Sequence, residues 1–319
     1  MGVPCKRDGR LVCPPLALFI KFGIPPLGYY LKTIFLTNDD GFDSYGLLCL
    51  KEALASIARV VVVAPAFEKS ACSHSLCVNK PLRLLKLKED FYKLDDGSPA
   101  DCVYVGVQEL FAGGLPDLLV SGINIGANMG EDTIYSGTVA GAIEGAIQGI
   151  PSIAISQCIR DKYGEDDKVA KRDFSLAIHF IQAMASSILN GDYDIGDRRL
   201  LNVNVPPIPK SSCNGLKVTQ LGYRIYNSSV QEQLNPRGQE YIWIGVNPLD
   251  WKERDNSNNP AVNDRNECMQ GASGAALPLV SDFSAVNDGY ISITPLQLDS
   301  TSYTDINRLD GYIRRSGLA

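Results

Sequence analysis

Residues 60–63 of this chain are four valines in a row, followed by Ala64 and ended by Pro65. β-Branched residues favour extended strands, and proline is excluded from the interior of a central strand. An uninterrupted apolar run offers no polar face to water. Such a strand fits a parallel sheet that is covered by helices on both faces.

Segments of strand and helix character alternate on both sides of this run. We expect strands at residues 34–37, 60–64, 118–120, 152–156 and 200–205, and helices at residues 44–56, from Ser98 onward, at 138–148 and at 170–189. Ser98, Pro99 and Asp101 together form a capping-box-like helix start. Because strand–helix alternation implies βαβ units, the sequence predicts an α/β fold with a doubly wound, mostly parallel sheet.

The alternation weakens after Pro206. Residues 216–221 and 241–246 have the character of strands in a hairpin or an extended arm, residues 250–267 are polar and loop-like, and order returns at 289–295. A C-terminal extended β-arm is expected at about residues 222–248, with aromatic side chains outside the core: Tyr223, Tyr226, Tyr241 and Trp243. Such an arm usually packs on a partner, so we expect a homo-oligomer.

The first 31 residues differ from the rest of the chain. Basic residues precede a short apolar stretch at 16–20, as in a signal peptide, but prolines and Lys21 bound that stretch and no small-residue cleavage site follows. Uncharged runs in this region are too short to span a bilayer. We therefore expect an irregular extension at residues 1–31, one α/β domain at residues 32–319, and no membrane association.

Charge and cysteine content narrow the partners and the compartment. A net charge of −6 and a pI of about 5.1 argue against a positively charged surface that binds nucleic acid. Nine cysteines without CxxC pairs fit reduced thiols in a cytoplasmic protein. With only two histidines in the chain, a multi-histidine zinc site is not expected.

Two adjacent carboxylates, Asp39 and Asp40, directly follow the first expected strand. In open α/β sheets the carboxyl ends of the strands line the ligand crevice. Neighbouring negative charges repel each other, and a hard divalent cation with oxygen ligands offsets that repulsion. The alternative is a solvated turn, because the sequence Asn-Asp-Asp-Gly is also good turn chemistry.

A loop rich in glycine and asparagine, residues 122–130, follows the strand at 118–120. Its glycines let the backbone approach a ligand, and the amides of Asn124 and Asn128 can bind a metal or donate to phosphate. The spacing is not that of a dinucleotide-binding GxGxxG motif. A plain turn cluster is the alternative.

Two further polar clusters occupy similar positions. Ser136, Gly137 and Thr138 open a helix, where hydroxyl and backbone N–H groups either bind an anion or simply cap the helix. Residues 68–75, which include Ser70 and His74, follow the second strand. Four polar clusters at the carboxyl ends of strands favour a functional site over four unrelated turns.

Several competing phosphate chemistries lack their motifs. The chain has no GxxxxGK[ST] phosphate loop, no GxSxG nucleophile elbow and no DxDx[TV] pattern. A cysteine phosphatase stays open by spacing, because Cys77 and Arg83 are six residues apart. No glycine between them could wrap a phosphate, so we expect Cys77 in a packed strand beside the crevice.

Taken together, the motifs resemble the SurE (survival protein E) family over roughly residues 32–299. The resemblance rests on Leu36-Thr37-Asn38-Asp39-Asp40-Gly41, Val63-Ala64-Pro65, Glu68-Lys69-Ser70, Ser73-His74-Ser75, Gly97-Ser98-Pro99-Ala100-Asp101-Cys102-Val103, Ser121-Gly122-Ile123-Asn124-Ile125-Gly126-Ala127-Asn128, Ser136-Gly137-Thr138-Val139, Asn202-Val203-Asn204-Val205-Pro206, Asn235-Pro236-Arg237-Gly238 and residues 289–296. The family usually has threonine where Ser98 stands. So many motifs in one order make coincidence untenable.

This resemblance implies a Rossmann-like fold and a metal-dependent 5′-nucleotidase. The enzyme would hydrolyse nucleoside 5′-monophosphates, with 3′-monophosphates as a further substrate class. Asp39, Asp40, Ser70 and Asn124 would hold one divalent ion per subunit, Mg²⁺ or Mn²⁺. The arm and the C-terminal segment would form a homodimer or homotetramer.

A mechanism follows from the chemistry of these groups. The ion would polarise the phosphoryl oxygens and activate a water molecule. Five residues would hold the phosphate: Asn38, Asn128, Ser136, Gly137 and Thr138. His74 is the candidate for proton transfer, and direct attack by Asp39 or Asp40 is an alternative. A nucleotide-binding sensor without turnover is the non-enzymatic alternative.

Overall fold

The structure is a computed structural model that describes residues 6–7, 10–11, 32–111, 113–159, 173–226, 230–244, 250–253 and 279–316. The extension expected at residues 1–31 lies mostly outside these ranges. Its described part consists of two short strands, β1 (Lys6–Arg7) and β2 (Arg10–Leu11), which pair only with each other.

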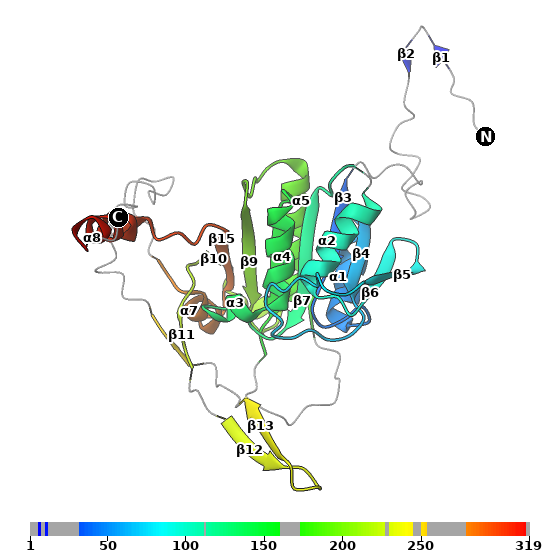
Figure 1. Ribbon diagram of the computed structural model, residues 1–319. Helices are drawn as coiled ribbons and strands as arrows, with labels where there is room; N and C mark the ends of the chain where they lie inside the picture. Colours follow the sequence, from blue (N-terminus) through cyan, green and yellow to red (C-terminus); the bar gives the residue numbers. More distant parts are fainter. Residues whose placement is uncertain are drawn as a thin grey trace.

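A nine-stranded sheet organises the described chain (Figure 1). Its order is β10-β15-β9-β8-β7-β3-β4-β6-β5. The strands are β3 (Thr33–Thr37), β4 (Arg59–Pro65), β5 (Arg83–Lys88), β6 (Phe91–Asp95), β7 (Leu118–Ile125), β8 (Ser152–Gln157), β9 (Arg199–Val205), β10 (Leu216–Val218) and β15 (Ile291–Gln297). All neighbours pair in parallel except β5 with β6 and β15 with β9. The predicted α/β fold with a mostly parallel sheet is confirmed.

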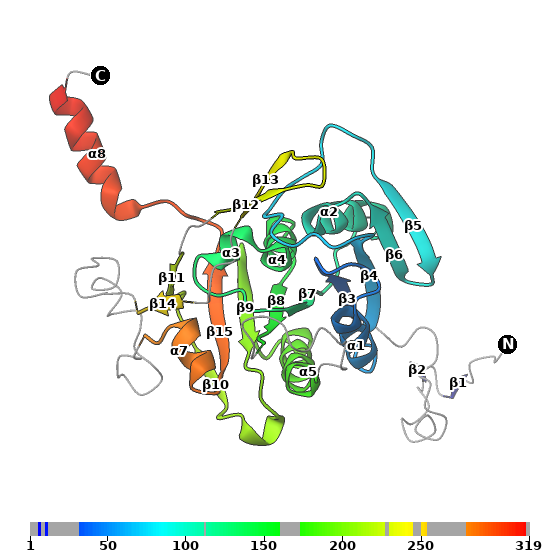
Figure 2. The ribbon, with the colours of Figure 1, turned by 90° about the horizontal axis from the view of Figure 1, so that it is seen from below.

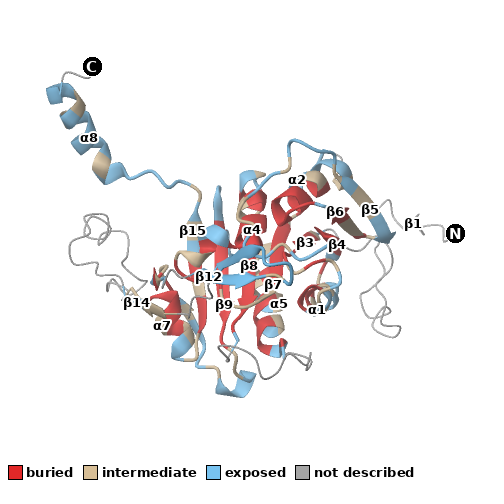
Figure 3. Ribbon diagram, turned by 60° about the horizontal axis from the view of Figure 1, so that its bottom comes forward, coloured by how far each residue is buried: buried red, intermediate tan, exposed pale blue. Residues whose placement is uncertain are grey.

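Helices cover both faces of the sheet, as the apolar strands require (Figure 2). α1 (Tyr45–Leu54) and α5 (Ser175–Asn190) pack on one face, and α2 (Pro99–Leu110) and α4 (Gly137–Ile147) pack on the other. Successive side chains of a strand point to opposite faces. In β3, Ile34 and Leu36 therefore join the core under α1 and α5, while Phe35 joins the core under α2 and α4. Figure 3 shows the resulting buried layer along the central strands.

The chain reverses its direction of travel across the sheet next to β3. From β3 it proceeds to β4 and β6 on one side, and then returns to β7, β8 and β9 on the other side. The reversal lies between β3 and β7, which pair directly with each other. In open α/β sheets ligands bind outside the carboxyl ends of the strands at such a switch point. The topology therefore marks the carboxyl ends of β3 and β7 as the place to look for a site.

The predicted start of α2 is confirmed in detail. Ser98 is the N-cap, Pro99 is the first helical residue, and Asp101 completes a capping box with Ser98. The Ser98 hydroxyl accepts from the Asp101 backbone N–H at 3.0 Å, and the Asp101 carboxylate accepts from the Ser98 backbone N–H at 2.9 Å. This pair satisfies two backbone donors that a helix start leaves without partners.

Two expectations about strands are wrong. Residues 216–218 belong to the main sheet as β10, paired in parallel with β15, and not to an arm. The strand expected at 118–120 continues as β7 to Ile125, into the predicted loop, because an irregularity between Ser121 and Asn124 lets its pairing with β8 resume. Short edge strands and bulges leave only weak patterns in a sequence.

The expected arm contains two small antiparallel pairs. β12 (Val230–Leu234) and β13 (Glu240–Ile244) form a hairpin, and β11 (Tyr223–Ile225) pairs with β14 (Asp250–Lys252) at its base. The loop expected from Asp250 therefore begins as a strand, and most of its remainder lies outside the described residues. The remaining elements are α3 (Asp132–Tyr135), a 3₁₀ turn at Lys210–Ser212, α7 (Asp282–Asn287) and α8 (Tyr303–Ser316).

The hairpin and α8 extend away from the sheet (Figure 1). α8 has no buried residue, although its exposed face carries Tyr303, Ile306, Leu309 and Tyr312. The hairpin likewise exposes Val230, Leu234, Tyr241, Ile242, Trp243 and Ile244. In the part of the chain that the structure describes, no helix combines the length and apolar character needed to cross a bilayer.

Candidate active site

Polar residues at or after the carboxyl ends of three strands lie on the edge of the sheet that the switch point marks, and the start of α4 contacts one of them. Asp39 and Asp40 follow β3, Ser70 follows β4, and Asn124 lies in the last residues of β7. Since β3, β4 and β7 are parallel neighbours, their carboxyl ends share one edge of the sheet. The N-terminus of α4 reaches this edge as well.

Asp39 is the best-defined group of the site. The residue is only 4% exposed. Its carboxylate accepts a hydrogen bond from the Thr138 hydroxyl at the start of α4. A side-chain carbon on Gly137 would lie 2.8 Å from the Asp39 Cβ and 2.9 Å from its Oδ2. Only glycine therefore lets the helix approach the carboxylate this closely.

Opposing effects act on the Asp39 carboxyl. Burial raises its pKa, and the hydrogen bonds from Thr138 and from backbone N–H groups lower it by less. The nearby charge of Glu68 raises the pKa further, so the net shift is upward. The ionised form is thus poorly solvated, and a cation at this position would offset the missing solvation.

The segment that carries Ser70 is anchored beside Asp39. The Lys69 backbone N–H donates to the Asp39 carbonyl oxygen at 2.7 Å, and the Ser70 hydroxyl donates to Glu68 Oε1 at 2.7 Å. Cys72 Sγ lies 3.1 Å from the position a Gly137 side-chain carbon would take. Burial and the charge of Asp39 raise the pKa of the Cys72 thiol, so a neutral thiol borders the site.

The oxygen-rich donor set suits a hard divalent cation. Asn124 donates its amide to the Gly126 carbonyl at 3.0 Å, which leaves its side-chain oxygen as the group that can bind a metal. Asn38 Oδ1 is buried and has no hydrogen-bond partner among the described residues. Within the described ranges no three His, Cys, Asp or Glu side chains are placed so that they could together hold a metal ion, so an ion here would rely on two carboxylates and neutral oxygens.

The two asparagines expected to hold phosphate make hydrogen bonds within the protein in this structure. Asn38 donates its amide hydrogens to the Gly41 carbonyl at 2.9 Å and to the Ser44 hydroxyl at 2.8 Å. Asn128 donates its amide to the Ser156 hydroxyl at 2.8 Å. Both amide hydrogens of Asn38 are thus used in the loop after β3, whereas the bond from the Asn128 amide to Ser156 uses one of its two hydrogens. The phosphate-binding role of both residues stays a prediction.

Asn128 is also fixed through its backbone. Its N–H donates to Asn204 Oδ1 at 2.9 Å, and its carbonyl oxygen accepts from the amides of Asn202 and Asn204 at 2.8 and 3.0 Å. The motif at residues 202–206 therefore has a structural role that the sequence did not predict. It holds the loop after β7 against β9.

The helix start expected to bind anions is formed as predicted. Ser136 is the N-cap of α4, and its hydroxyl accepts from the Val139 backbone N–H at 3.0 Å. The Thr138 hydroxyl bonds to Asp39. The partial positive charge of a helix N-terminus thus lies against the Asp39 carboxylate.

His74 pairs with Glu144, a buried residue of α4. The distance from His74 Nε2 to Glu144 Oε2 is 2.9 Å, and Gln148 donates to the other carboxylate oxygen at 2.9 Å. Burial raises the pKa of Glu144, but the bonds from His74 and Gln148 outweigh burial, so the pKa is lowered. Glu144 lies six residues after Thr138, about 9 Å along the helix axis. The observed contact therefore anchors the segment of His74, and its proton-transfer role stays a prediction.

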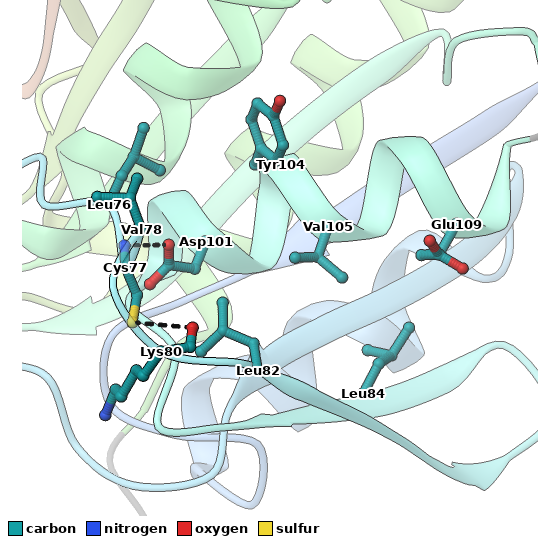
Figure 4. Close-up of a pocket in the computed structure, with 10 residues that line it drawn as sticks. All are labelled: Leu76, Cys77, Val78, Lys80, Leu82, Leu84, Asp101, Tyr104, Val105 and Glu109. Carbon is teal, nitrogen blue, oxygen red and sulfur yellow. Dashed lines mark hydrogen bonds between the residues drawn. The ribbon is translucent and has the colours of Figure 1, made fainter.

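A pocket of about 740 Å³ lies between α2 and the segment that leads to β5, and the expected metal and phosphate residues are not among those that line it (Figure 4). Cys77 lines it from an irregular segment, so the expectation of a packed strand is wrong. Its backbone N–H donates to Asp101 at 2.8 Å and its thiol contacts the Lys80 carbonyl at 3.9 Å. Arg83, the phosphate-binding partner that a cysteine phosphatase would need, does not line the pocket.

Sequence reasoning missed Glu144 and Asp282. Glu144 is an acidic residue among small side chains in a helix that is expected to pack on the sheet. An acidic residue at such a position could have indicated a buried polar contact. Asp282 is buried and accepts backbone N–H bonds from Gly130, Gly222 and Phe283. No local pattern could have linked residues so far apart in the chain.

Several known proteins are similar to this chain in sequence and in fold. Residues 34–228 match the family model described as survival protein SurE. The chain is 50% identical over 286 residues to the 5′-nucleotidase SurE of Helicobacter hepaticus, covering 89% of this chain and 100% of that protein. It is 47% identical to the 5′-nucleotidase SurE of Wolinella succinogenes, covering 89% and 100%. The crystal structure of the SurE protein from Aquifex aeolicus is similar, with a TM-score of 0.69 and 37% identity, covering 88% of this chain and 99% of that one. The chain therefore belongs to the SurE family.

Proposed function

We propose that this chain is a divalent-metal-dependent nucleotidase that hydrolyses nucleoside 5′-monophosphates to nucleoside and inorganic phosphate, with 3′-monophosphates as a further substrate class. The relatives named 5′-nucleotidase SurE support the reaction. The observation that carries the proposal is the placement of Asp39. Its buried carboxylate stands at the switch point of the sheet and against the N-terminus of α4.

In this proposal Asp39, Asp40, Ser70 and Asn124 hold one Mg²⁺ or Mn²⁺ ion per subunit. Their oxygen donors fit these ions better than zinc or copper. When bound, such an ion polarises a phosphoryl oxygen and lowers the pKa of bound water. Thr138 and Gly137 fix the position of the Asp39 carboxylate, which keeps the metal ligand in register with the helix start.

The phosphate would lie at the start of α4, on Ser136, Gly137 and Thr138. A helix N-terminus offers backbone N–H groups and a favourable dipole to an anion. Asn38 and Asn128 would also hold the phosphate, and their hydrogen bonds in this structure position the two loops that frame this place. Water is the expected nucleophile, and direct attack by Asp39 or Asp40 is the alternative.

The same proposal extends to assembly and compartment. A homodimer or homotetramer would cover the apolar side chains that the hairpin and α8 expose. The six cysteines that the structure describes as free thiols support a reducing, cytoplasmic location.

Release of inorganic phosphate from AMP tests the proposal. The wild-type protein should release phosphate with Mg²⁺ or Mn²⁺, stop in excess chelator, and recover when the metal is restored. Cys77→Ser should behave as wild type. Binding of AMP without any phosphate release would favour a sensor, and full activity in chelator with an inactive Cys77→Ser would favour a cysteine phosphatase.

A further inference from the structure

Two tyrosines from distant parts of the chain meet beside the start of α4. Tyr135 is the last residue of α3 and directly precedes the N-cap Ser136, and Tyr226 follows β11 at the base of the arm. Their rings meet edge to face, with centroids 6.4 Å apart and planes at 86°. Tyr135 is 56% exposed and Tyr226 is 38% exposed. An accessible aromatic corner therefore borders the proposed phosphate position.

Tyr226 is held rigidly in this corner. Its hydroxyl donates to Asp132 Oδ1 at 2.8 Å, and Arg224 Nε donates to Asp132 Oδ2 at 2.9 Å. The Arg224 backbone N–H also donates to Glu131 Oε2 at 2.6 Å. In Figure 2, α3 lies between β11 and α4. The base of the arm is thus fixed to α3, within one turn of Tyr135.

The backbone at Tyr135 is fixed from the opposite side. The Ser73 N–H donates to the Tyr135 carbonyl at 3.0 Å, and the Ser73 hydroxyl donates to the Ile134 carbonyl at 2.7 Å. These bonds come from the same segment that carries Ser70. The aromatic corner and the proposed metal ligand are therefore parts of one connected framework.

We propose that Tyr135 and Tyr226 form the surface on which the nucleobase of the substrate stacks. The inference rests on the proposed nucleotidase function. In a nucleoside monophosphate the ribose separates the base from the phosphate, so a phosphate on Ser136 to Thr138 places the base among the residues that flank the helix start. Every base has a π-face, and stacking on aromatic rings is tolerant of base identity. The corner would thus recognise nucleotides broadly and favour them over sugar phosphates without a base.

Single exposed tyrosines are common on protein surfaces and need no function. This pair differs because two elements converge on it and hydrogen bonds restrain both partners. Tyr193 offers the contrast and a matched control. It is 42% exposed, follows α5, and precedes β9, which puts it at the amino end of that strand and away from the site.

The test compares hydrolysis of AMP with hydrolysis of ribose 5-phosphate, which has the phosphate and sugar but no base. Tyr135→Ala and Tyr226→Ala should each lower kcat/KM for AMP by at least about fivefold, the loss expected when one base–aromatic stack is removed. Ribose 5-phosphate turnover should stay near the wild-type value. Tyr135→Phe keeps the ring and should retain AMP turnover, and Tyr193→Ala should change neither substrate.

Each other outcome has a definite meaning. Equal losses on both substrates, or no loss on either, would overturn the base-stacking role. A fall in molecular mass of either alanine variant, measured by light scattering, would assign the pair to a subunit contact instead. If the wild-type protein hydrolyses neither compound with Mg²⁺ or Mn²⁺, the proposed nucleotidase function fails, and this inference fails with it.

Discussion

Asp39 combines burial with a charge that burial disfavours. Local sequence sufficed to predict it, because adjacent carboxylates after an apolar strand form a short-range pattern. The capping box of α2 was predictable for the same reason. The pairing of His74 with Glu144 was not, since the two residues are 70 positions apart and meet only through tertiary packing. At the scale of residues, sequence predicts the groups that local chemistry defines and misses the partners that the fold supplies.

The His74–Glu144 contact gives a prediction about stability. Removing His74 leaves the buried Glu144 carboxylate with Gln148 as its remaining side-chain partner among the described residues, so His74→Ala should lower the free energy of unfolding by roughly 2–3 kcal/mol. Adding Glu144→Gln should recover part of that loss, because the amide carries no charge. Denaturant unfolding of the two single variants and the double variant measures the coupling. Strictly additive losses would show that the contact contributes nothing to the fold.

Among the secondary-structure elements, the long apolar strands and their covering helices followed from sequence. Residues 216–218 did not, because a three-residue edge strand carries little pattern and pairs with β15, which is distant in the chain. The extension of β7 to Ile125 was not predicted, because the glycines of this segment are typical of a loop. β5, β6 and α8 were not expected at all, and two of these three elements are largely exposed. A hydrophobic pattern in the sequence predicts a strand or helix only where that element buries one of its faces.

Asp282 joins three elements, and its removal should loosen all of them. Its carboxylate accepts from the N–H groups of Gly130 and Gly222 at 2.8 Å each and of Phe283 at 3.0 Å. Asp282→Ala leaves these buried donors without an acceptor, so it should lower the free energy of unfolding by at least about 2 kcal/mol. Asp288→Ala, which removes an exposed carboxylate at the end of the same helix, is the control.

The effect of Asp282→Ala should depend on pH. Burial raises the pKa of Asp282 to about 6, despite the hydrogen bonds that lower it. A carboxyl with a raised pKa in the folded protein contributes most stability at low pH, and this contribution is lost as the pH rises through about 6. The difference in unfolding free energy between wild type and Asp282→Ala should therefore be larger at pH 5 than at pH 8. An equal or reversed difference would contradict the raised pKa.

At the scale of the whole molecule, two apolar surfaces stay exposed among the residues that the structure describes. They are the hairpin β12–β13 and one face of α8. Light scattering should give a mass of at least twice the 34.6 kDa of one chain. Trp243→Glu in the hairpin or Leu309→Glu in α8 should lower that mass, while far-ultraviolet circular dichroism stays unchanged. A wild-type protein that measures as a single chain would contradict the assembly.

In the proposed reaction, Asp39 serves a metal-assisted hydrolysis at the switch point of the sheet. The decisive measurement of this role is the rate of phosphate release from AMP by Asp39→Asn in saturating Mn²⁺. The amide keeps the size of the side chain and removes a charge. We predict a loss of at least about 2–3 kcal/mol of transition-state stabilisation, roughly a hundredfold in rate. The thermal midpoint without metal should not fall, because burial raises the pKa of Asp39 and its ionised form opposes folding at neutral pH. A folded Asp39→Asn protein that releases phosphate at the wild-type rate would contradict the role of Asp39 in hydrolysis.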